Sequence, residues 1–503
     1  MSTDLSYFLM PWLDPSLMML TALGTFAGIY IGAIPGLSVT MAVSILISFT
    51  FSWEVNDALA LMVGVYMGGV YGGSRTAILL NIPGAPSAIA TSFDGFPLAR
   101  LGEAGKAIGV TTVVSFIGGM VGIVVLALAA PMVADFALMF APRDYLLLAV
   151  MGLLLVGSMS GESLAKGLFS GALGITIGMV GMDPLTAEGR FTFDSVTLLG
   201  GIPYVVVMIG MFGISEAISQ LHHLKDVVIR QDVSKILPSW STVVKYIPLS
   251  IRTSFIGVII GALPGTGGDI AALFAYDHAK RSVKKPSRPF GQGAYEGLVA
   301  PEAANNAAVG GAYIPMLTLG IPGDAVTAVM IGALYIHGLK PGPMLMIETP
   351  HLFWFSVGNL TLANIFMLIF GLMGIRLFAK IVEIPKGVLI PLIVLLSVVG
   401  AYAINNNVVD IYWMLGFGIF GYLLKMYGFQ IGPVILGVIL GPLMDVSYRR
   451  AMMSVNNTPD AFFMDLLTNP ISLVLTLAIL FMLIGQTPLW TKLKAGLAKA
   501  RTA

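Results

Sequence analysis

The chain has no cysteine among its 503 residues, and only 11% of its residues are charged. Without cysteine it has no disulfide framework, no thiolate nucleophile and no thiolate metal site. Soluble proteins carry about 25% charged residues, so this composition, which is 57% hydrophobic, excludes a soluble protein. The mean hydropathy of +0.90 predicts an all-α polytopic membrane protein.

Signatures of enzymes and of nucleic-acid binding are also missing. The 27 basic and 26 acidic residues nearly balance, whereas a nucleic-acid partner needs a basic surface. The five histidines are scattered and show no His-Glu-x-x-His spacing. Gly102-Glu-Ala-Gly105-Lys106-Ala is nearest to a phosphate loop, but it lacks the upstream glycine and the hydroxyl. We therefore expect no enzyme activity and no cofactor, with sodium as the candidate coupling ion.

A short phrase with proline and glycine occurs twice. Gly28–Gly36 and Gly257–Gly265 both read Gly-x3-Gly-Ala-aliphatic-Pro-Gly, and a second pair follows as Asn81–Gly84 and Gly320–Gly323. Two adjacent glycines precede each member of the second pair, Gly72-Gly73 and Gly310-Gly311. The matched order indicates an internal duplication.

Each of these phrases is expected to break a membrane helix. Proline removes a backbone donor and crowds the preceding turn, while glycine adopts dihedral angles that other residues avoid. Freed backbone groups are tolerated in a membrane only where protein or a water-filled cavity meets them. Matched breaks in two halves point to a transporter's binding site, although one such break alone is equally well explained as a kink or a packing glycine.

The hydrophobic runs predict about twelve transmembrane helices with re-entrant or broken hairpins, at roughly 20 residues for each span. We divide the chain into a first repeat, a cytoplasmic linker, a second repeat and a basic cytoplasmic tail. Their boundaries are 1–220, 221–245, 246–487 and 488–503.

Basic residues predict that the two repeats are inverted. Lysine and arginine are enriched in cytoplasmic loops. They flank the interrupted run 246–279 on both sides, whereas the run 16–51 has none on either side and is followed by Glu54 and Asp57. Each run then enters and leaves on one face, and the two enter from opposite faces.

Short polar residues concentrate at the breaks, where freed amides can hold an anion and freed carbonyls a cation. We predict a midplane site for a solute that bears a carboxylate. The predicted solute-binding residues are Gly36, Ser38, Asn81, Gly84, Ser87, Pro264, Gly265, Thr266, Gly267, Asn305, Asn306, Pro322, Gly323 and Arg75. The predicted coupling-ion residues are Asn81, Asn305, Asn306, Glu302 and Thr318. The alternative is that these side chains only join helices, which contributes about 1 kcal/mol each.

Ionisable residues inside membrane runs are candidates for function because placing them there costs at least ~2.5 kcal/mol. Arg75 is either the counter-charge of a bound carboxylate or the partner of Glu54 or Asp57. Three acidic residues either bind a cation or proton or lie at a hydrated helix end: Asp269, Glu302 and Asp324.

Several phrases across nearly the whole chain resemble the TctA family, the large membrane subunit of bacterial tripartite tricarboxylate transporters. They are Gly32-Ala-Ile-Pro35-Gly36-Leu37, Tyr71-Gly72-Gly73, Leu79-Leu80-Asn81-Ile-Pro83-Gly84, Phe191-Thr-Phe-Asp194-Ser195-Val, Gly261-Ala-Leu-Pro264-Gly265, Ala300-Pro301-Glu302-Ala-Ala-Asn305-Asn306-Ala and Ile314-Pro-Met-Leu-Thr318-Leu-Gly320-Ile-Pro322-Gly323. Two positions differ from the family pattern, Ser38 and Asp324.

The resemblance implies a multi-pass permease of the bacterial inner membrane. It implies two partners, a small four-helix membrane subunit and a periplasmic solute-binding protein. The implied function is secondary active import of citrate or another di- or tricarboxylate with a sodium or proton gradient, by an elevator-type movement of the hairpins. The alternative that the residues leave open is a passive anion channel.

Overall fold

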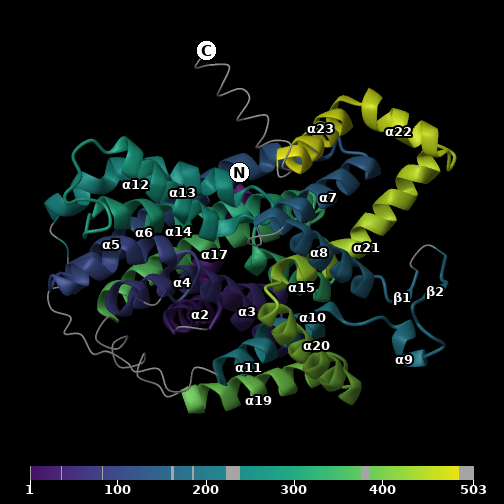
Figure 1. Cartoon of the computed structure of the whole chain (residues 1–503), viewed down its shortest axis with the longest axis horizontal. Coiled ribbons are helices and arrows are strands. Elements are labelled where there is room, and N and C mark those ends of the chain that lie inside the picture. Colours follow the sequence, from purple (N-terminus) through teal and green to yellow (C-terminus); the bar gives the residue numbers. More distant parts are fainter. Residues whose placement is uncertain are drawn as a thin grey trace. The chain divides into compact units, whose positions relative to one another are not determined.

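The structure is a computed structural model of the chain. It describes residues 2–34, 37–81, 83–159, 164–183, 186–221, 238, 240–374 and 386–485. Three predicted features lie wholly or mainly outside these residues: the first break at Pro35 and Gly36, most of the linker, and the basic tail. Among the described residues the elements are almost all helices, and one small sheet pairs β1 (Gly181–Met182) antiparallel with β2 (Gly189–Arg190) (Figure 1).

The chain forms two compact units. Unit 1 comprises Met1–Asp135 and Val205–Leu423, and unit 2 comprises Phe136–Tyr204 and Leu424–Ala503. Unit 1 holds all or most of α1 (Ser2–Leu13), α2 (Pro15–Ala33), α3 (Val39–Thr50), α4 (Val55–Leu80), α5 (Ala88–Arg100), α6 (Ala104–Ala137), α10 (Tyr204–Met208), the π-helix η1 (Ile209–Ile214), α11 (Ser215–Leu221), α12 (Trp240–Gly261), α13 (Gly267–Ser282), α14 (Glu296–Leu319), α15 (Ala325–Ile336), α16 (Pro343–Glu348), α17 (Pro350–Met373), α19 (Lys386–Asn405) and α20 (Val408–Met426). Unit 2 holds α7 (Pro142–Met159), α8 (Leu164–Gly178), α9 (Val196–Leu199), α21 (Ile431–Ser454), α22 (Pro459–Thr468) and α23 (Pro470–Gly485) with the sheet.

Helices α2 and α4 pack backbone against backbone because glycine occupies their contact. A methyl group on Gly28 would lie 2.3 Å from the Val65 carbonyl oxygen. One on Gly32 would lie 2.2 Å from the Gly69 carbonyl oxygen. Small residues at a helix interface allow this close approach in membranes, where apolar side chains gain little by meeting each other rather than lipid.

Helices α12 and α14 make the same contact in the second copy of the phrase. A methyl group on Gly257 would lie 2.2 Å from the Ala304 carbonyl oxygen. One on Gly261 would lie 2.4 Å from the Ala308 carbonyl oxygen. The duplicated glycines thus have duplicated partners.

The contacts also fix the register of the duplication in α4 and α14. A methyl group on Gly72 would meet the Ile29 carbonyl oxygen at 2.3 Å, and one on Gly311 would meet that of Val258 at 2.5 Å. Gly72 therefore corresponds to Gly311, 239 positions later (311 − 72), the same offset that separates Asn81 from Gly320. The pairs Gly72-Gly73 and Gly310-Gly311 therefore do not correspond residue by residue, because Gly72 matches the second glycine of the later pair.

Both α4 and α14 end on a left-handed residue before their breaks. Asn81 has φ 58° and its N–H donates to the Thr76 carbonyl oxygen. Gly320 has φ 69° and its N–H donates to the Pro315 carbonyl oxygen. Asparagine and glycine are the residues that adopt this conformation at helix C-termini, so the two breaks have the same local cause.

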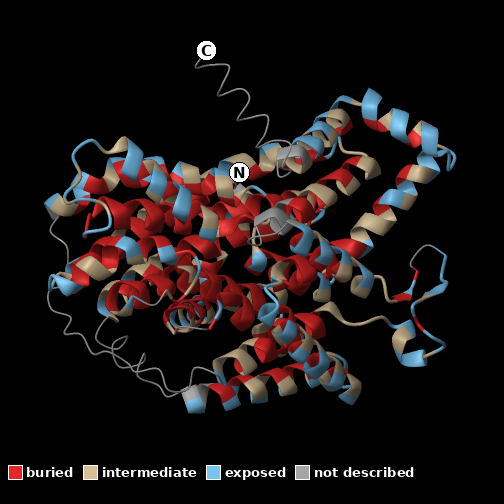
Figure 2. Ribbon diagram, in the orientation of Figure 1, coloured by how far each residue is buried: buried red, intermediate tan, exposed pale blue. Residues whose placement is uncertain are grey.

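Helix α14 is buried along its length (Figure 2). Every residue from Glu296 to Thr318 is buried, and α4 is nearly as buried from Ala58 to Leu79. A helix enclosed on all sides needs no polar face, so its polar side chains must find partners inside the protein.

Seven helical segments of the described residues are long and apolar enough to cross a membrane, or eight if the bent pair α22 and α23 is one span. The prediction of about twelve transmembrane helices is therefore not confirmed. The breaks leave α3 and α15 with only 12 residues each. Helices α4 and α14 are longer, but their glycine and polar residues lower the hydropathy.

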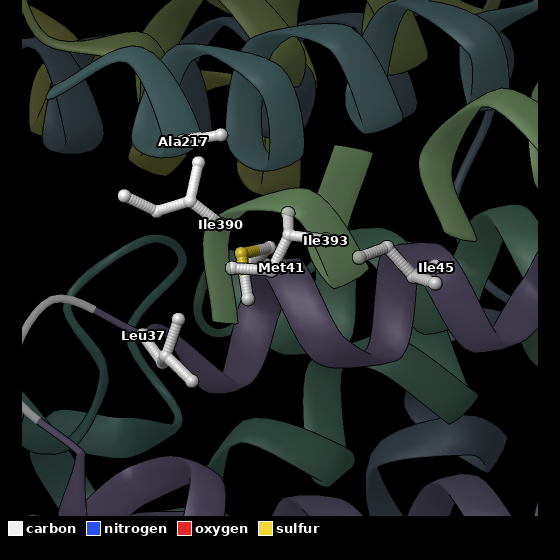
Figure 3. Close-up of a cluster of buried hydrophobic side chains, with 6 residues drawn as sticks. All are labelled: Leu37, Met41, Ile45, Ala217, Ile390 and Ile393. Carbon is white, nitrogen blue, oxygen red and sulfur yellow. The ribbon is translucent and has the colours of Figure 1, made fainter. Parts of the chain in front are cut away.

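Helix α3 packs against α19 and α11 within unit 1 through a cluster of apolar side chains (Figure 3). The cluster consists of Leu37, Met41, Ile45, Ala217, Ile390 and Ile393. It attaches the half-helix that follows the first break to helices distant in sequence.

In unit 2, charged side chains join the sheet to α21. Arg190 lies 2.8 Å from Asp445, and Arg449 lies 2.8 Å from Asp183, whose side chain is only 2% exposed. Each of the two carboxylates, Asp183 and Asp445, therefore has an arginine partner that balances its charge. This network belongs to the scaffold of unit 2.

Candidate transport site

The two breaks of the second copy meet. The Gly265 N–H donates to the Pro322 carbonyl oxygen at 3.2 Å. A methyl group on Gly267, which has φ 57°, would lie 2.8 Å from Asp324 Cβ. The beginnings of the half-helices α13 and α15 are therefore adjacent, as expected if both helices are interrupted at one site.

The second break of each copy folds back on the helix before the first break. A methyl group on Gly84 would lie 2.2 Å from the Gly32 carbonyl oxygen, and the Gly84 N–H donates to the Gly73 carbonyl oxygen at 3.2 Å. Gly323 does the same, since a methyl group there would lie 2.7 Å from the Gly261 carbonyl oxygen. A backbone atom makes the shortest of these contacts at each glycine.

A hydrogen bond between Tyr66 and Asp324 connects the two copies. The Tyr66 hydroxyl, from α4, donates to the Asp324 carboxylate. Asp324 is also the N-cap of α15, where its other oxygen accepts from the Thr327 N–H at 2.8 Å. The Tyr66 ring stacks on Tyr313 of α14 with ring centroids 6.1 Å apart. Asp324 is thus fixed by both copies.

A second carboxylate, Asp269, lies beside this hydrogen bond. It sits in the first turn of α13 and interacts electrostatically with Asp324 and with the Ser87 amide and hydroxyl. Asp269 is exposed and Asp324 is partly exposed. Two carboxylates that repel each other are stabilised by a cation or proton bound between them, so this position suits a cation.

Asn305 anchors the start of α13 to α4. Its Nδ2 donates to the Val70 carbonyl oxygen at 3.1 Å. A methyl group on Gly268 would lie 2.2 Å from Asn305 Oδ1, so the amide lies directly against the break. The predicted site residue Asn305 therefore touches both copies.

The side-chain amide of Asn306 uses its donor but not its acceptor in the described structure. The residue is fully buried, and its Nδ2 donates to the Glu302 carbonyl oxygen at 3.2 Å. Its Oδ1 has no hydrogen-bond partner within the described part of the chain. A buried polar atom of this kind usually bonds to water, an ion or a ligand.

Glu302 is buried and accepts hydrogen bonds from two hydroxyl groups. Thr91 of α5 donates at 2.5 Å and Ser115 of α6 donates at 3.1 Å. Arg75 interacts with it electrostatically. Glu302 therefore lies in a polar network between helices, one turn away from Asn306.

Arg75 does not pair with Glu54 or Asp57. All three belong to α4 or its cap, and at 1.5 Å per residue each of the two acids lies at least about 27 Å from Arg75 along the axis. Arg75 instead donates to Thr112 at 2.8 Å and lies 4.1 Å from the Tyr71 ring centroid. Its charge is compensated inside the protein.

Three of the remaining predicted side chains form hydrogen bonds with main-chain atoms of their own helix end. Ser38 accepts from the Met41 N–H at 3.0 Å as the N-cap of α3. The Thr266 hydroxyl donates to the Leu263 carbonyl oxygen at 3.0 Å, and that of Thr318 donates to the Ile314 carbonyl oxygen at 2.7 Å. Pro264 is buried just before the break, and Gly36 lies outside the described residues.

Sequence reasoning missed two residues of this region. Tyr66 is not part of a recognisable motif. In the alignment of the two copies it corresponds to Asn305, which lies 239 positions later (305 − 66). Asp94 is fully buried and its Oδ1 accepts three main-chain N–H bonds at 2.8, 2.9 and 2.8 Å, from Gly291, Gly293 and Ala294. The glycines around position 292 were the available signal for that carboxylate.

Comparison with known proteins agrees with the matched phrases. Residues 18–436 match the family model described as "Tripartite tricarboxylate transporter TctA family". The chain is 37% identical over 452 residues to an "Uncharacterized 52.8 kDa protein in TAR-I ttuC' 3'region" of Agrobacterium vitis, covering 89% of both chains. It is 40% identical over 216 residues, 43% of its own length and 87% of the other, to an "Uncharacterized protein in TAR-II ttuC' 3'region" of the same organism. No solved structure matches. The chain belongs to the TctA family of tripartite tricarboxylate transporters and is a multi-pass membrane component of such a transporter.

Proposed function

We propose that this chain is the permease subunit of a secondary active transporter that imports an organic di- or tricarboxylate with a sodium or proton gradient. Membership of the TctA family makes it a membrane transporter component. The observation that carries the proposal further is the meeting of broken helices from both copies at the hydrogen bond between Tyr66 and Asp324.

The solute is held by main-chain groups at the breaks and by amide side chains. Half-helix N-termini favour an anion through their unpaired N–H groups and the helix dipole. Gly84 and Gly265 add no side chain of their own to this backbone. Asn306 Oδ1 supplies an unused acceptor for a hydroxyl group or for ordered water. The further solute-binding residues named from the sequence belong to the same proposal.

The coupling cation lies next to the solute and on the side of the second copy. Asp269 and Asp324 bring two carboxylates to adjacent half-helices. Asn305 supplies an amide at the same position. A sodium ion or proton here would remove the repulsion that the carboxylates exert on an incoming anion, so the two would bind together.

Transport proceeds by movement of the broken hairpins as one body, in two inverted repeats. The described breaks of the duplicated phrases lie in unit 1, which supports a common movement. Labelling that places residues 53–57 outside and residues 280–288 inside is the expected result. Finding both segments on one face would remove the inversion.

The chain works in the bacterial inner membrane with a small membrane subunit and a periplasmic solute-binding protein. Tripartite transporters have further subunits, and this supports the proposal. The solute-binding protein would choose the carboxylate before it reaches the breaks.

Reconstitution of all subunits in liposomes tests the proposal. We expect labelled carboxylate to accumulate against its own gradient only when a sodium or proton gradient is imposed, and to be recovered unchanged. Equilibration without accumulation would indicate a passive anion channel. Accumulation that ignores both ions would contradict secondary active transport.

A further inference from the structure

A basic surface of unit 1 lies away from the breaks. It consists of Arg252 on α12 and four cations at and beyond the end of α13, which are Lys280, Arg281, Lys284 and Lys285. All five are exposed. The Arg252 Nη2 donates to the Ser282 hydroxyl at 2.8 Å, and this bond brings α12 to the segment that carries the other four.

Three carboxylates hold the loop that follows Lys284 and Lys285. Asp94 Oδ1 accepts the main-chain N–H bonds of residues 291, 293 and 294. Arg288 lies 2.7 Å from Glu103, and Glu296 accepts from the Ser287 N–H and hydroxyl. Three buried or half-buried carboxylates therefore hold residues 287–294, which directly follow Lys284 and Lys285 in the chain.

These three carboxylates do not compensate the charges of the basic surface, where Arg281 is the residue with an acidic partner in the described part of the chain. Glu103 pairs with Arg288, while Asp94 and Glu296 accept from main-chain and hydroxyl groups. Asp277 lies 2.8 Å from Arg281. Among the described residues no ion pair involves Arg252, Lys280, Lys284 or Lys285, so at least four positive charges face outward together.

An exposed apolar strip continues from the basic surface along α12. The strip consists of Phe255 and Ile259, which follow Arg252 by three and seven residues and therefore lie on the same helix face. Phe255 is 50% exposed and Ile259 is 65% exposed. Residues 255–261 of α12 are apolar and carry no charge, so lipid chains are the natural neighbours of this strip.

We propose that the basic surface and the strip form a binding site for an anionic phospholipid. The phosphodiester headgroup binds Arg252, Lys284 and Lys285, and the acyl chains lie along Phe255 and Ile259. Guanidinium and ammonium groups bind phosphate oxygens with charge-assisted hydrogen bonds. Clustered basic residues beside a membrane helix attract anionic lipid at about 1 kcal/mol per residue.

Lipid titration of the purified full chain in a neutral detergent tests the site. Dioleoylphosphatidylglycerol should raise the temperature of thermal unfolding and should be retained in native mass spectra. Dioleoylphosphatidylcholine and inorganic phosphate should do neither. The triple variant Arg252→Gln, Lys284→Gln, Lys285→Gln should bind phosphatidylglycerol on the order of 100-fold more weakly, because three contacts of about 1 kcal/mol each are removed.

A matched control removes the same charge elsewhere. Lys340→Gln, Lys425→Gln and Arg450→Gln change exposed cations outside the basic surface and should leave retention unchanged. Lys284→Arg with Lys285→Arg keeps the charge and should also retain the lipid, even if the triple variant folds poorly. Equal loss in both triple variants would overturn the proposal, as would an equal stabilisation by phosphate alone.

Discussion

The two copies of the duplicated phrase share their backbone contacts but differ in charge. Gly32 meets Gly69 as Gly261 meets Ala308, and Gly84 folds back as Gly323 does. The half-helices of the first copy begin at Ser38 and Ser87, with no acidic residue in their first turns.

In the second copy the half-helices carry Asp269 and Asp324 at their beginnings. The close glycine contacts between helices are therefore the same in both copies, whereas the residues at the beginnings of the half-helices differ in charge. If the proposed function is right, the neutral breaks would suit an anionic solute and the acidic breaks would suit a cation.

The largest effect is expected where the copies agree. Gly32→Val and Gly261→Val each place side-chain atoms into a neighbouring backbone carbonyl, 2.2 Å and 2.4 Å from the first added carbon. Overpacking of this kind costs on the order of 3 kcal/mol. Both variants should lose the monodisperse peak in size-exclusion chromatography.

Gly416→Ala is the matched control for these variants, because nothing lies within 4 Å of the added methyl group. It should purify as the unmodified protein does. Normal folding of either valine variant would show that the shared contacts are dispensable.

The second largest effect is expected on stability, at Glu302, where the two copies carry different residues. The corresponding position of α4 is Val63 (302 − 239), a buried apolar residue. Glu302→Ala leaves the buried charge of Arg75 without its acidic neighbour, and breaking a buried pair costs about 3 to 5 kcal/mol. The temperature of thermal unfolding in detergent should fall.

The double variant Arg75→Met, Glu302→Met should recover much of that loss, because no charge is then left buried. If the double variant is less stable than Glu302→Ala, the two residues are not a compensated pair.

A third test makes the second copy resemble the first. Asp324→Ser keeps an N-cap side chain but removes the charge and the acceptor of Tyr66. We expect normal folding and about tenfold slower uptake in liposomes, since a hydrogen bond to a charged group contributes about 1.5 to 3 kcal/mol.

Tyr66→Phe distinguishes the hydrogen bond from the charge, because it removes only the bond. Asp277→Ser, on the exposed face of α13, is the control. Unchanged uptake by Asp324→Ser would mean that the charge difference between the copies has no role in transport.

The smallest effect concerns the contact between Glu103, after α5, and Arg288, before α14. The hydrogen bond from Arg288 holds the pKa of Glu103 below its ordinary value. Because the folded pKa is the lower one, this stabilisation is present above the unfolded pKa of about 4.3 and is lost as the pH falls through the folded value.

Thermal unfolding should therefore show a small acid-induced decrease that Glu103→Gln reduces. An identical pH profile for the variant would assign the decrease to other groups.

Local sequence was enough to predict the breaks and the burial of the amides. Proline, glycine and asparagine act on the backbone within a few residues, so Asn81 and Gly320 end their helices where expected. Asn305 and Asn306 could be placed in the interior because they occur within an otherwise apolar run.

Partners distant in sequence could not be predicted in the same way. Tyr66 and Asp324 are 258 positions apart, and Thr91 and Glu302 are 211 apart. These contacts depend on how α4, α5 and α14 pack, which no local pattern encodes. For the same reason the sequence does not show that Arg75 lies beside Thr112 and Tyr71 and not beside Glu54 or Asp57. The role of Arg75 as the counter-charge of a bound carboxylate stays a prediction.

The complete enclosure of α14 has a consequence for biogenesis. A segment that carries Glu302, Asn305 and Asn306 and is surrounded only by protein gains nothing from lipid by itself. During synthesis it must leave the translocon together with neighbours that already accept its polar groups, so α4, α5 and α6, which precede it in the chain, would act as its insertion template.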